Sequence, residues 1–307
     1  MRILMFGRGT ISTVYGQALQ TAGHHVEFYV RPGRAAEYGD EVRIDLLDAR
    51  RNPLGRPVRH LVSTRLRESL EPADAFDLVV LSVSHDRLAE AATFLAPRIG
   101  DATVLVFGNV WDEPLVAVAP IPAEQVVFGF PQGGGGFADD GVLHAGLLRT
   151  VIVGTAGTSA SPRELVVQRA FRRAGFTVRE EQDMRGWLLL HFVSDAGMFS
   201  QAVRSGGMAR MIGDRRAFRD AFLTAGDLLP VLGARGVDLR RHRAAVLPLR
   251  HPALVAAAIA WATTRIPFAR VSLAPHTDPN AAEPRAVLRD MLRETRRLGM
   301  SVPRLET

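Results

Sequence analysis

Residues 1–16, MRILMFGRGTISTVYG, combine a short apolar strand, a glycine turn and the start of a helix. Gly7 and Gly9 form the turn, and a serine occupies the third glycine position of the G-x-G-x-x-G pattern. Such a turn lets backbone N–H groups reach a pyrophosphate at a helix N-terminus, where the helix dipole favours negative charge. We therefore expect a nucleotide on the turn residues Gly7, Arg8, Gly9, Thr10 and Ile11. The alternative is a tight strand–helix turn that binds no ligand.

In dinucleotide-binding folds, the end of the second strand distinguishes NAD from NADP, about 20 residues after the glycines. An acidic residue there binds the ribose 2′-hydroxyl, whereas an arginine suits a 2′-phosphate. The segment VEFYVRPGR places Arg31 at this point, while Glu27 lies inside the strand. We therefore expect NADP as the cofactor. The alternative is that Arg31 only caps an exposed strand end.

The composition excludes several classes of chemistry. The 307-residue chain is 47% hydrophobic and 23% charged, which is ordinary for a globular protein. It has no cysteine, and this excludes disulfides, thiolate catalysis and cysteine-bound metals. All 38 basic residues are arginine, so no lysine can donate a proton or form a Schiff base. Because Asp and Glu are dispersed along the chain, we expect no metal site.

Charge and hydropathy limit the partners that we expect. The net charge is +6, but the arginines are interspersed with acidic residues, so we expect no nucleic-acid binding. The apolar run 253–263 is too short to span a bilayer. Because Met1 leads directly into the first predicted strand, we expect no signal peptide. We therefore expect a cytoplasmic protein that binds a small-molecule substrate and no membrane. We also expect a homodimer. The apolar helix 253–262 fits a dimer interface as well as it fits the core of a domain.

The first half of the chain alternates strand-like and helix-like segments, which predicts a parallel α/β sheet. Glycines 133–136 are expected to form a loop, either near the cofactor or as a surface turn. Ser82, which ends a predicted strand, or Ser84 just after it is expected to line the nicotinamide side of the site. The predicted strands are 2–6, 26–30, 42–44, 58–62, 78–82, 103–107 and 176–179, with 126–129, 142–144 and 150–154 extending the sheet as antiparallel strands; the predicted helices are 11–22, 86–96 and 161–174.

From about residue 184 the pattern changes to helices, most clearly 187–202, 216–232, 253–264 and 284–298. The predicted fold class is therefore α/β in two domains. Residues 1–182 form an N-terminal Rossmann-type, doubly wound sheet that binds NADP. Residues 183–307 form an all-helical C-terminal domain for substrate binding and dimerisation.

Three segments follow one another in the order and spacing of a known family: RILMFGRGTIS with Arg31, then VLVFGNVWDEP, then AEPRAVLRDMLRETRRLGMSVP. On these segments the chain resembles the ketopantoate reductase (2-dehydropantoate 2-reductase) family, which joins a Rossmann domain to a helical domain. The resemblance implies that Asn109 lies by the nicotinamide and substrate. It also implies that Glu283 lies in the active-site cleft, with Ser272 and His276 in the segment before it.

The chain departs from this family on the helix between the domains. Family members carry a lysine two residues after a tryptophan, as the proton donor to the ketone oxygen, and asparagines four and eight residues further on. Aligned on Trp187, the segment WLLLHFVSDAG places Leu189, Val193 and Gly197 at these positions. They share one helix face, because residues four apart lie one turn apart. On this register the proton donor of the family is missing.

A second register is shifted by two residues. It places His191 at the lysine position and Asp195 at the position of the first asparagine. A histidine held by a carboxylate can protonate a developing alkoxide near neutral pH. The alternative is a structural i,i+4 pair.

These observations predict an NADPH-dependent reductase that transfers hydride to a small 2-oxo acid or a related carbonyl. One alternative is a specialised NADP-dependent oxidoreductase acting on a different carbonyl or an imine, and another is a non-catalytic NADPH-binding protein on the same scaffold. The predicted catalytic residues are His191, Glu283 and Asn109. The predicted cofactor-binding residues are Gly7, Arg8, Gly9, Thr10, Ile11, Arg31, Ser82 and Asn109.

Overall fold

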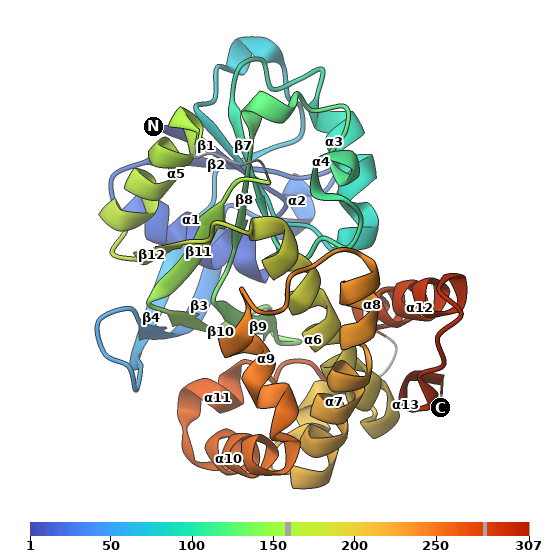
Figure 1. The fold of residues 1–307 in the computed structure, drawn as a ribbon. Coiled ribbons are helices and arrows are strands. Elements are labelled where there is room, and N and C mark those ends of the chain that lie inside the picture. The colour runs from blue at the N-terminus through green and yellow to red at the C-terminus, as the bar shows by residue number, and fades with distance from the viewer. Residues whose placement is uncertain (157–160, 279–280, 307) are drawn as a thin grey trace. The chain divides into compact units, whose positions relative to one another are not determined.

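The computed structural model describes residues 1–156, 161–278 and 281–306. The chain divides into two compact units, Met1–Met184 and Arg185–Thr307. The boundary thus lies between residues 184 and 185, against an expected position between 182 and 183. Figure 1 shows sheets and helices in the first unit and helices alone in the described part of the second.

The strands all belong to the first unit as far as the chain is described. They are β1 (Arg2–Phe6), β2 (His25–Tyr29), β3 (Glu41–Ala49), β4 (Arg56–Ser63), β5 (Leu66–Arg67), β6 (Leu78–Leu81), β7 (Thr103–Phe107), β8 (Val126–Phe130), β9 (Gly133–Phe137), β10 (Leu143–Leu148), β11 (Thr150–Gly154) and β12 (Thr177–Glu180). Its helices are α1 (Thr10–Thr21), α2 (Ala35–Tyr38), α3 (Leu88–Leu95), α4 (Pro114–Ala117) and α5 (Pro162–Arg173), with 3-10 turns η1 (Pro72–Asp74), η2 (His85–Arg87) and η3 (Ala123–Gln125).

The second unit is built from helices over its described residues. They are α6 (Met184–Ser205), α7 (Arg215–Asp227), α8 (Leu229–Ala234), α9 (Arg243–Arg250), α10 (Pro252–Arg265), α11 (Pro267–Val271), α12 (Ala282–Arg297) and α13 (Pro303–Glu306), with the 3-10 turn η4 (Met208–Met211). The predicted helix 216–232 is thus two helices, α7 and α8, and Pro230 lies at the start of the second. Proline is tolerated there because the first turn of a helix leaves its N–H groups unbonded.

An eight-stranded sheet forms the centre of the first unit, in the order β12-β11-β8-β7-β6-β1-β2-β5. In this order, the neighbouring strands β8, β7, β6, β1, β2 and β5 run parallel to one another. β11 pairs antiparallel with β8. Helices α1 and α5 cover one face and α3 the other (Figure 1), so that β6 and β7 are buried along their whole length. This sheet and the helical second unit confirm the predicted fold class.

A second sheet of four strands has the order β4-β3-β10-β9. One hydrophobic core joins this sheet to the main sheet and to α1. The core contains Ile3 of β1, Leu19 of α1 and Leu147 of β10. Residues 42–44 and 58–62 were predicted in the main sheet, and 142–144 as its extension, and these predictions were wrong. β3 and β4 form an antiparallel hairpin in the second sheet, and β10 pairs with β3. Apolar alternation identifies a strand but not its partner, because pairing joins residues far apart in the sequence.

The four-glycine run 133–136 belongs to β9, so the predicted loop was also wrong. β9 pairs antiparallel with β10. A Cβ atom at Gly135 would meet the carbonyl oxygen of His144 and would lie 2.6 Å from the Cα atom of Ala145. The run is therefore a strand whose glycines allow an unusually close approach to its neighbour.

Gly135→Ala is expected to lower the free energy of unfolding by about 1–3 kcal/mol, because the new methyl group overlaps the backbone of β10. Urea unfolding measures this change. Gly233→Ala in α8 is the control, since a Cβ there has no described atom within 4 Å. That variant is expected to be neutral or slightly stabilising, because alanine favours a helix over glycine. Equal effects of the two substitutions would contradict the steric explanation.

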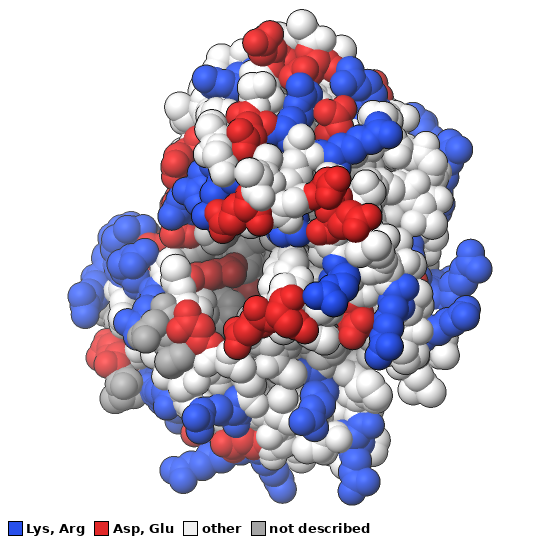
Figure 2. Space-filling view, turned by 180° about the vertical axis from the view of Figure 1, so that it is seen from behind, with Lys and Arg blue, Asp and Glu red and all other residues white. Residues whose placement is uncertain are grey.

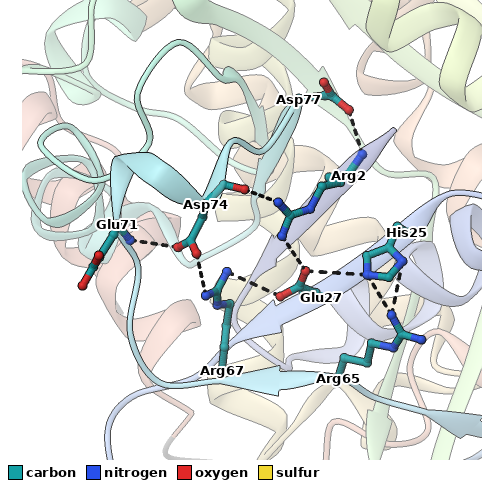
Figure 3. Close-up of polar contacts among 8 residues, drawn as sticks. All are labelled: Arg2, His25, Glu27, Arg65, Arg67, Glu71, Asp74 and Asp77. Carbon is teal, nitrogen blue, oxygen red and sulfur yellow. Dashed lines mark hydrogen bonds and ion pairs between the residues drawn. The ribbon is translucent and has the colours of Figure 1, made fainter.

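A network of ion pairs surrounds the start of β1 and β2 (Figure 3). Arg2 Nη2 lies 3.2 Å from Glu27 Oε1, and Arg67 Nη1 lies 3.4 Å from Glu27 Oε2. Arg67 also donates to Asp74 Oδ1 at 2.8 Å. The carboxylate of Glu27, only 16% exposed, therefore forms ion pairs with arginines from both strands that neighbour β2.

Asp74→Asn is expected to lower the free energy of unfolding at pH 7. It is also expected to reduce the fall of this free energy as the pH is lowered. Burial acts to raise the pKa of Asp74, but the N–H of Glu71 and the guanidinium of Arg67 outweigh it, and the pKa is lowered. The ionised carboxylate thus adds stability above the unfolded-chain pKa of about 3.9, and this is lost as the pH falls through the lower folded-state pKa. Urea unfolding at pH 7, 5, 4 and 3 measures the effect.

Asp101→Asn is the control for this prediction. Asp101 also pairs with an arginine, Arg163, but its side chain is 93% exposed. Solvent screens such a pair, so we expect little change in stability or in its pH dependence. If Asp74→Asn kept the parent's full acid dependence, the Asp74 carboxylate would have no part in it.

Candidate functional site

The predicted nucleotide turn joins β1 to α1. Gly7 adopts φ +97°, a conformation that favours glycine, and its N–H donates to the carbonyl oxygen of Tyr29 at 2.9 Å. Gly9 precedes α1 as its N-cap, no side chain caps this helix, and its first turn contains no acidic residue. A Cβ at Gly7 or Gly9 would have no heavy atom of the described chain within 4 Å. The turn therefore presents bare backbone and an uncapped helix N-terminus to open space, as an anion site requires.

Three further predicted residues lie at the same edge of the sheet. Arg31 follows β2, Ser82 directly follows β6, and Asn109 follows β7. These strands and β1 are parallel neighbours in the order β7-β6-β1-β2, so their carboxyl ends meet at one edge. In open α/β sheets this is the edge where ligands bind. Ser82 and Asn109 are half-buried there, and Arg31 is exposed.

Arg8 connects the turn to the second sheet. Its guanidinium carbon lies 4.8 Å from the ring centroid of Tyr38 and 5.6 Å from that of Phe137, the last residue of β9. Burial lowers the pKa of Arg8, and Tyr38 partly offsets this. The glycine strand β9 thus ends beside the glycine turn of β1 and α1, in keeping with the first of the two places expected for the glycine run.

The turn after β2 is held by a carboxylate that the sequence reasoning missed. The N–H of Arg34 donates to the carbonyl oxygen of Arg31 at 3.0 Å, and Gly33 adopts φ +83°. Glu68, the residue after β5, accepts the N–H of Ala35 at 2.7 Å. The N–H groups of Ala35 and Gly33 lower the pKa of Glu68. β5 has only two residues, too few to show a hydropathy pattern.

On α6, the first of the two registers lies on a buried face. Leu189 and Val193 are fully buried. A Cβ at Gly197 would meet the carbonyl oxygen of Ala221 and lie 2.9 Å from the Cβ of Ala225, both on α7. A side chain as long as asparagine does not fit at Gly197 without a shift of α7.

The second register lies on a partly exposed face of the same helix. His191 Nε2 is 3.5 Å from Asp195 Oδ1, and the two side chains are 29% and 24% exposed. The imidazole also stacks on the indole of Trp187, with centroids 5.1 Å apart and planes 15° apart. The histidine is therefore held on one side by a ring and on another by a carboxylate. Glu283, the third predicted catalytic residue, is exposed in the first turn of α12.

Figure 2 shows arginines interspersed with Asp and Glu on the face that it draws. Over residues 1–156, 161–278 and 281–306, no three His, Asp or Glu side chains are placed to hold a metal ion. Within the same ranges no single helix is long and apolar enough to cross a membrane. Only α9 and α10 taken together, with a bend of 93° between them, have the length and composition of such a span.

Comparison with known proteins gives the family. The family model described as "Ketopantoate reductase PanE/ApbA" matches residues 3–157, half of the chain. No curated protein matches the sequence.

Solved structures share the fold over the whole chain. 2-Dehydropantoate 2-reductase from Geobacter metallireducens GS-15 is 17% identical, with a TM-score of 0.72 over 100% of this chain and 97% of that one. PanE/ApbA family ketopantoate reductase from Ralstonia eutropha JMP134 is 18% identical, with a TM-score of 0.67 over 100% and 95%. D-Mandelate dehydrogenase with NADH and anilino(oxo)acetate is 12% identical, with a TM-score of 0.73 over 100% and 95%. At these identities, the similarity to the solved structures shows only that the fold is shared. The family model, in contrast, matches the amino-acid sequence. The chain belongs to the ketopantoate reductase PanE/ApbA family.

Proposed function

We propose that this chain is an NADPH-dependent reductase that converts a small 2-oxo acid, or a related carbonyl compound, to the alcohol. The observation that carries the proposal is the bare turn from Gly7 to Ile11 at the uncapped N-terminus of α1. Membership of the ketopantoate reductase family supports it. So does the shared fold with D-mandelate dehydrogenase, whose solved structure contains NADH and anilino(oxo)acetate.

The residues at the carboxyl edge of the sheet fit a dinucleotide. In the proposal, the N–H groups of Gly9, Thr10 and Ile11 bind the pyrophosphate, because the start of α1 offers donors without a competing carboxylate. Arg31, exposed after β2, binds the 2′-phosphate. Ser82 and Asn109 line the nicotinamide side. When bound, NADPH supplies the hydride that is added to the carbonyl carbon.

The proton that must reach the carbonyl oxygen comes, in this proposal, from His191. Asp195 pairs with the imidazole, at 3.5 Å from Asp195 Oδ1 to His191 Nε2, and orients the ring. Trp187 stacks on the same ring and restricts its rotation. Asn109 hydrogen-bonds the substrate or the nicotinamide ribose, and Glu283 binds substrate hydroxyl groups or takes part in proton relay.

A second candidate is reduction of an imine by the same hydride. The buried face of Leu189 and Val193 favours it, because the register that carries the family's proton donor holds only apolar side chains here. An iminium substrate already carries its proton, so the absence of a donor at that register matters less.

The test is in two steps. Binding of NADPH and NADH is first measured by quenching of tryptophan fluorescence. Loss of reduced-nicotinamide absorbance is then followed with ketopantoate, a panel of other 2-oxo acids, and a panel of imines. Turnover of a 2-oxo acid supports the first candidate, and turnover of imines alone supports the second. Binding without turnover of any compound would leave a non-catalytic NADPH-binding protein and contradict both.

A further inference from the structure

Glu68 is placed beside the turn that carries Arg31. β5 pairs parallel with β2, and the N–H of Val30 donates to the carbonyl oxygen of Arg67 at 2.9 Å. The next residue, Glu68, accepts the N–H of Ala35 at 2.7 Å. Its carboxylate therefore binds backbone N–H groups of the turn, those of Gly33 and Ala35 among them, as a bound anion would.

The arginines of this turn are engaged to different extents. Arg34 lies 2.9 Å from the carboxylate of Glu37 and donates to the hydroxyl of Tyr38 at 3.0 Å. Arg31 is exposed and forms no ion pair with the part of the chain that the structure describes. The turn thus carries one cation without an ion pair to the described residues, Arg31, and one carboxylate bound to its backbone, Glu68.

We infer that Glu68 limits the preference of this protein for NADPH over NADH, an inference that rests on the proposed use of a nicotinamide dinucleotide. The N–H groups bound by Glu68 are not open to a phosphate. A 2′-phosphate next to Arg31 is attracted by the guanidinium and repelled by the carboxylate, whereas the 2′-hydroxyl of NADH experiences little of either. Glu68 is therefore a specificity-determining residue that acts through its charge.

Glu68→Gln isolates that charge, because the amide oxygen can still accept the N–H of Ala35. We expect NADPH to bind about three- to tenfold more tightly to this variant at low salt, with the Kd for NADH changed less than about twofold. The gain should shrink at about 0.5 M salt, where charges are screened beyond a few ångströms. Isothermal titration with each dinucleotide measures both constants, without reference to activity.

Three variants control the experiment. Glu71→Gln makes the same chemical change in a carboxylate that also accepts a backbone N–H, but in the network at the start of β1 (Figure 3), and should leave both constants unchanged. Glu68→Asp keeps the charge and should retain a preference near that of the parent. Arg31→Ala should weaken NADPH binding and leave NADH almost unaffected.

The outcomes separate this inference from the proposed function. If the parent binds neither dinucleotide, the proposed function fails. If the parent binds both and Glu68→Gln leaves the ratio of the two constants unchanged, the inference is overturned while the function stands. Equal weakening of NADPH and NADH by Glu68→Gln, with a lowered Tm, would also overturn it and would show that Glu68 only braces the turn.

Discussion

Gly9→Asp is expected to abolish dinucleotide binding while leaving the protein as stable as the parent or slightly more so. Gly9 is the N-cap of α1, with φ −74° and ψ 176°, which any residue can adopt. Aspartate is a preferred N-cap, worth a few tenths of a kcal/mol over glycine, and its charge favours the helix dipole by about 0.3–1 kcal/mol. The same carboxylate would fill the space and take the donors that we assign to the pyrophosphate.

The two effects have opposite signs, which makes the experiment informative. Titration with NADPH should show binding at least about 100-fold weaker, the result of a penalty of about 3 kcal/mol from overlap and like charge. Thermal unfolding should show an unchanged or raised Tm. Gly9→Asn is the matched control, because it caps the helix without a charge and should weaken binding less. Parent-like affinity in Gly9→Asp would place the dinucleotide elsewhere.

The first strand, the glycine turn and α1 could be predicted because their signals are local. The bounds predicted for β1, β7 and β11 agree with the structure, since each is a short apolar run between turn residues. The neighbouring parallel strands then place Arg31, Ser82 and Asn109 at one edge with the glycine turn. That step needs only the strand order, which a doubly wound fold supplies.

The remaining features depend on contacts between distant parts of the chain. Nothing local in residues 133–136 distinguishes a glycine loop from β9, whose existence depends on pairing with β10. Glu68 follows a two-residue strand and accepts a hydrogen bond from a turn that lies more than thirty residues earlier in the sequence. On α6, periodicity placed Leu189 and His191 on different faces, but only packing shows that the first is buried and the second partly exposed.

His191→Asn is expected to lower kcat by at least about 100-fold for reduction of a 2-oxo acid, with a smaller effect on KM. A positioned general acid contributes about 10²- to 10⁴-fold, and asparagine cannot supply a proton. Steady-state kinetics with NADPH saturating measure kcat and KM.

Two further variants separate acid catalysis from a structural role. His191→Phe keeps a flat ring that can stack on Trp187 but has no transferable proton, so it should retain the parent's Tm and lose activity as His191→Asn does. His144→Asn disrupts a comparable pair in the second sheet, where His144 Nδ1 lies 3.8 Å from Asp45 Oδ2. This variant should leave kcat unchanged. If His191→Phe turned over at a near-normal rate, the His191–Asp195 pair would be structural. The proton would then have to come from solvent, as the imine alternative also allows.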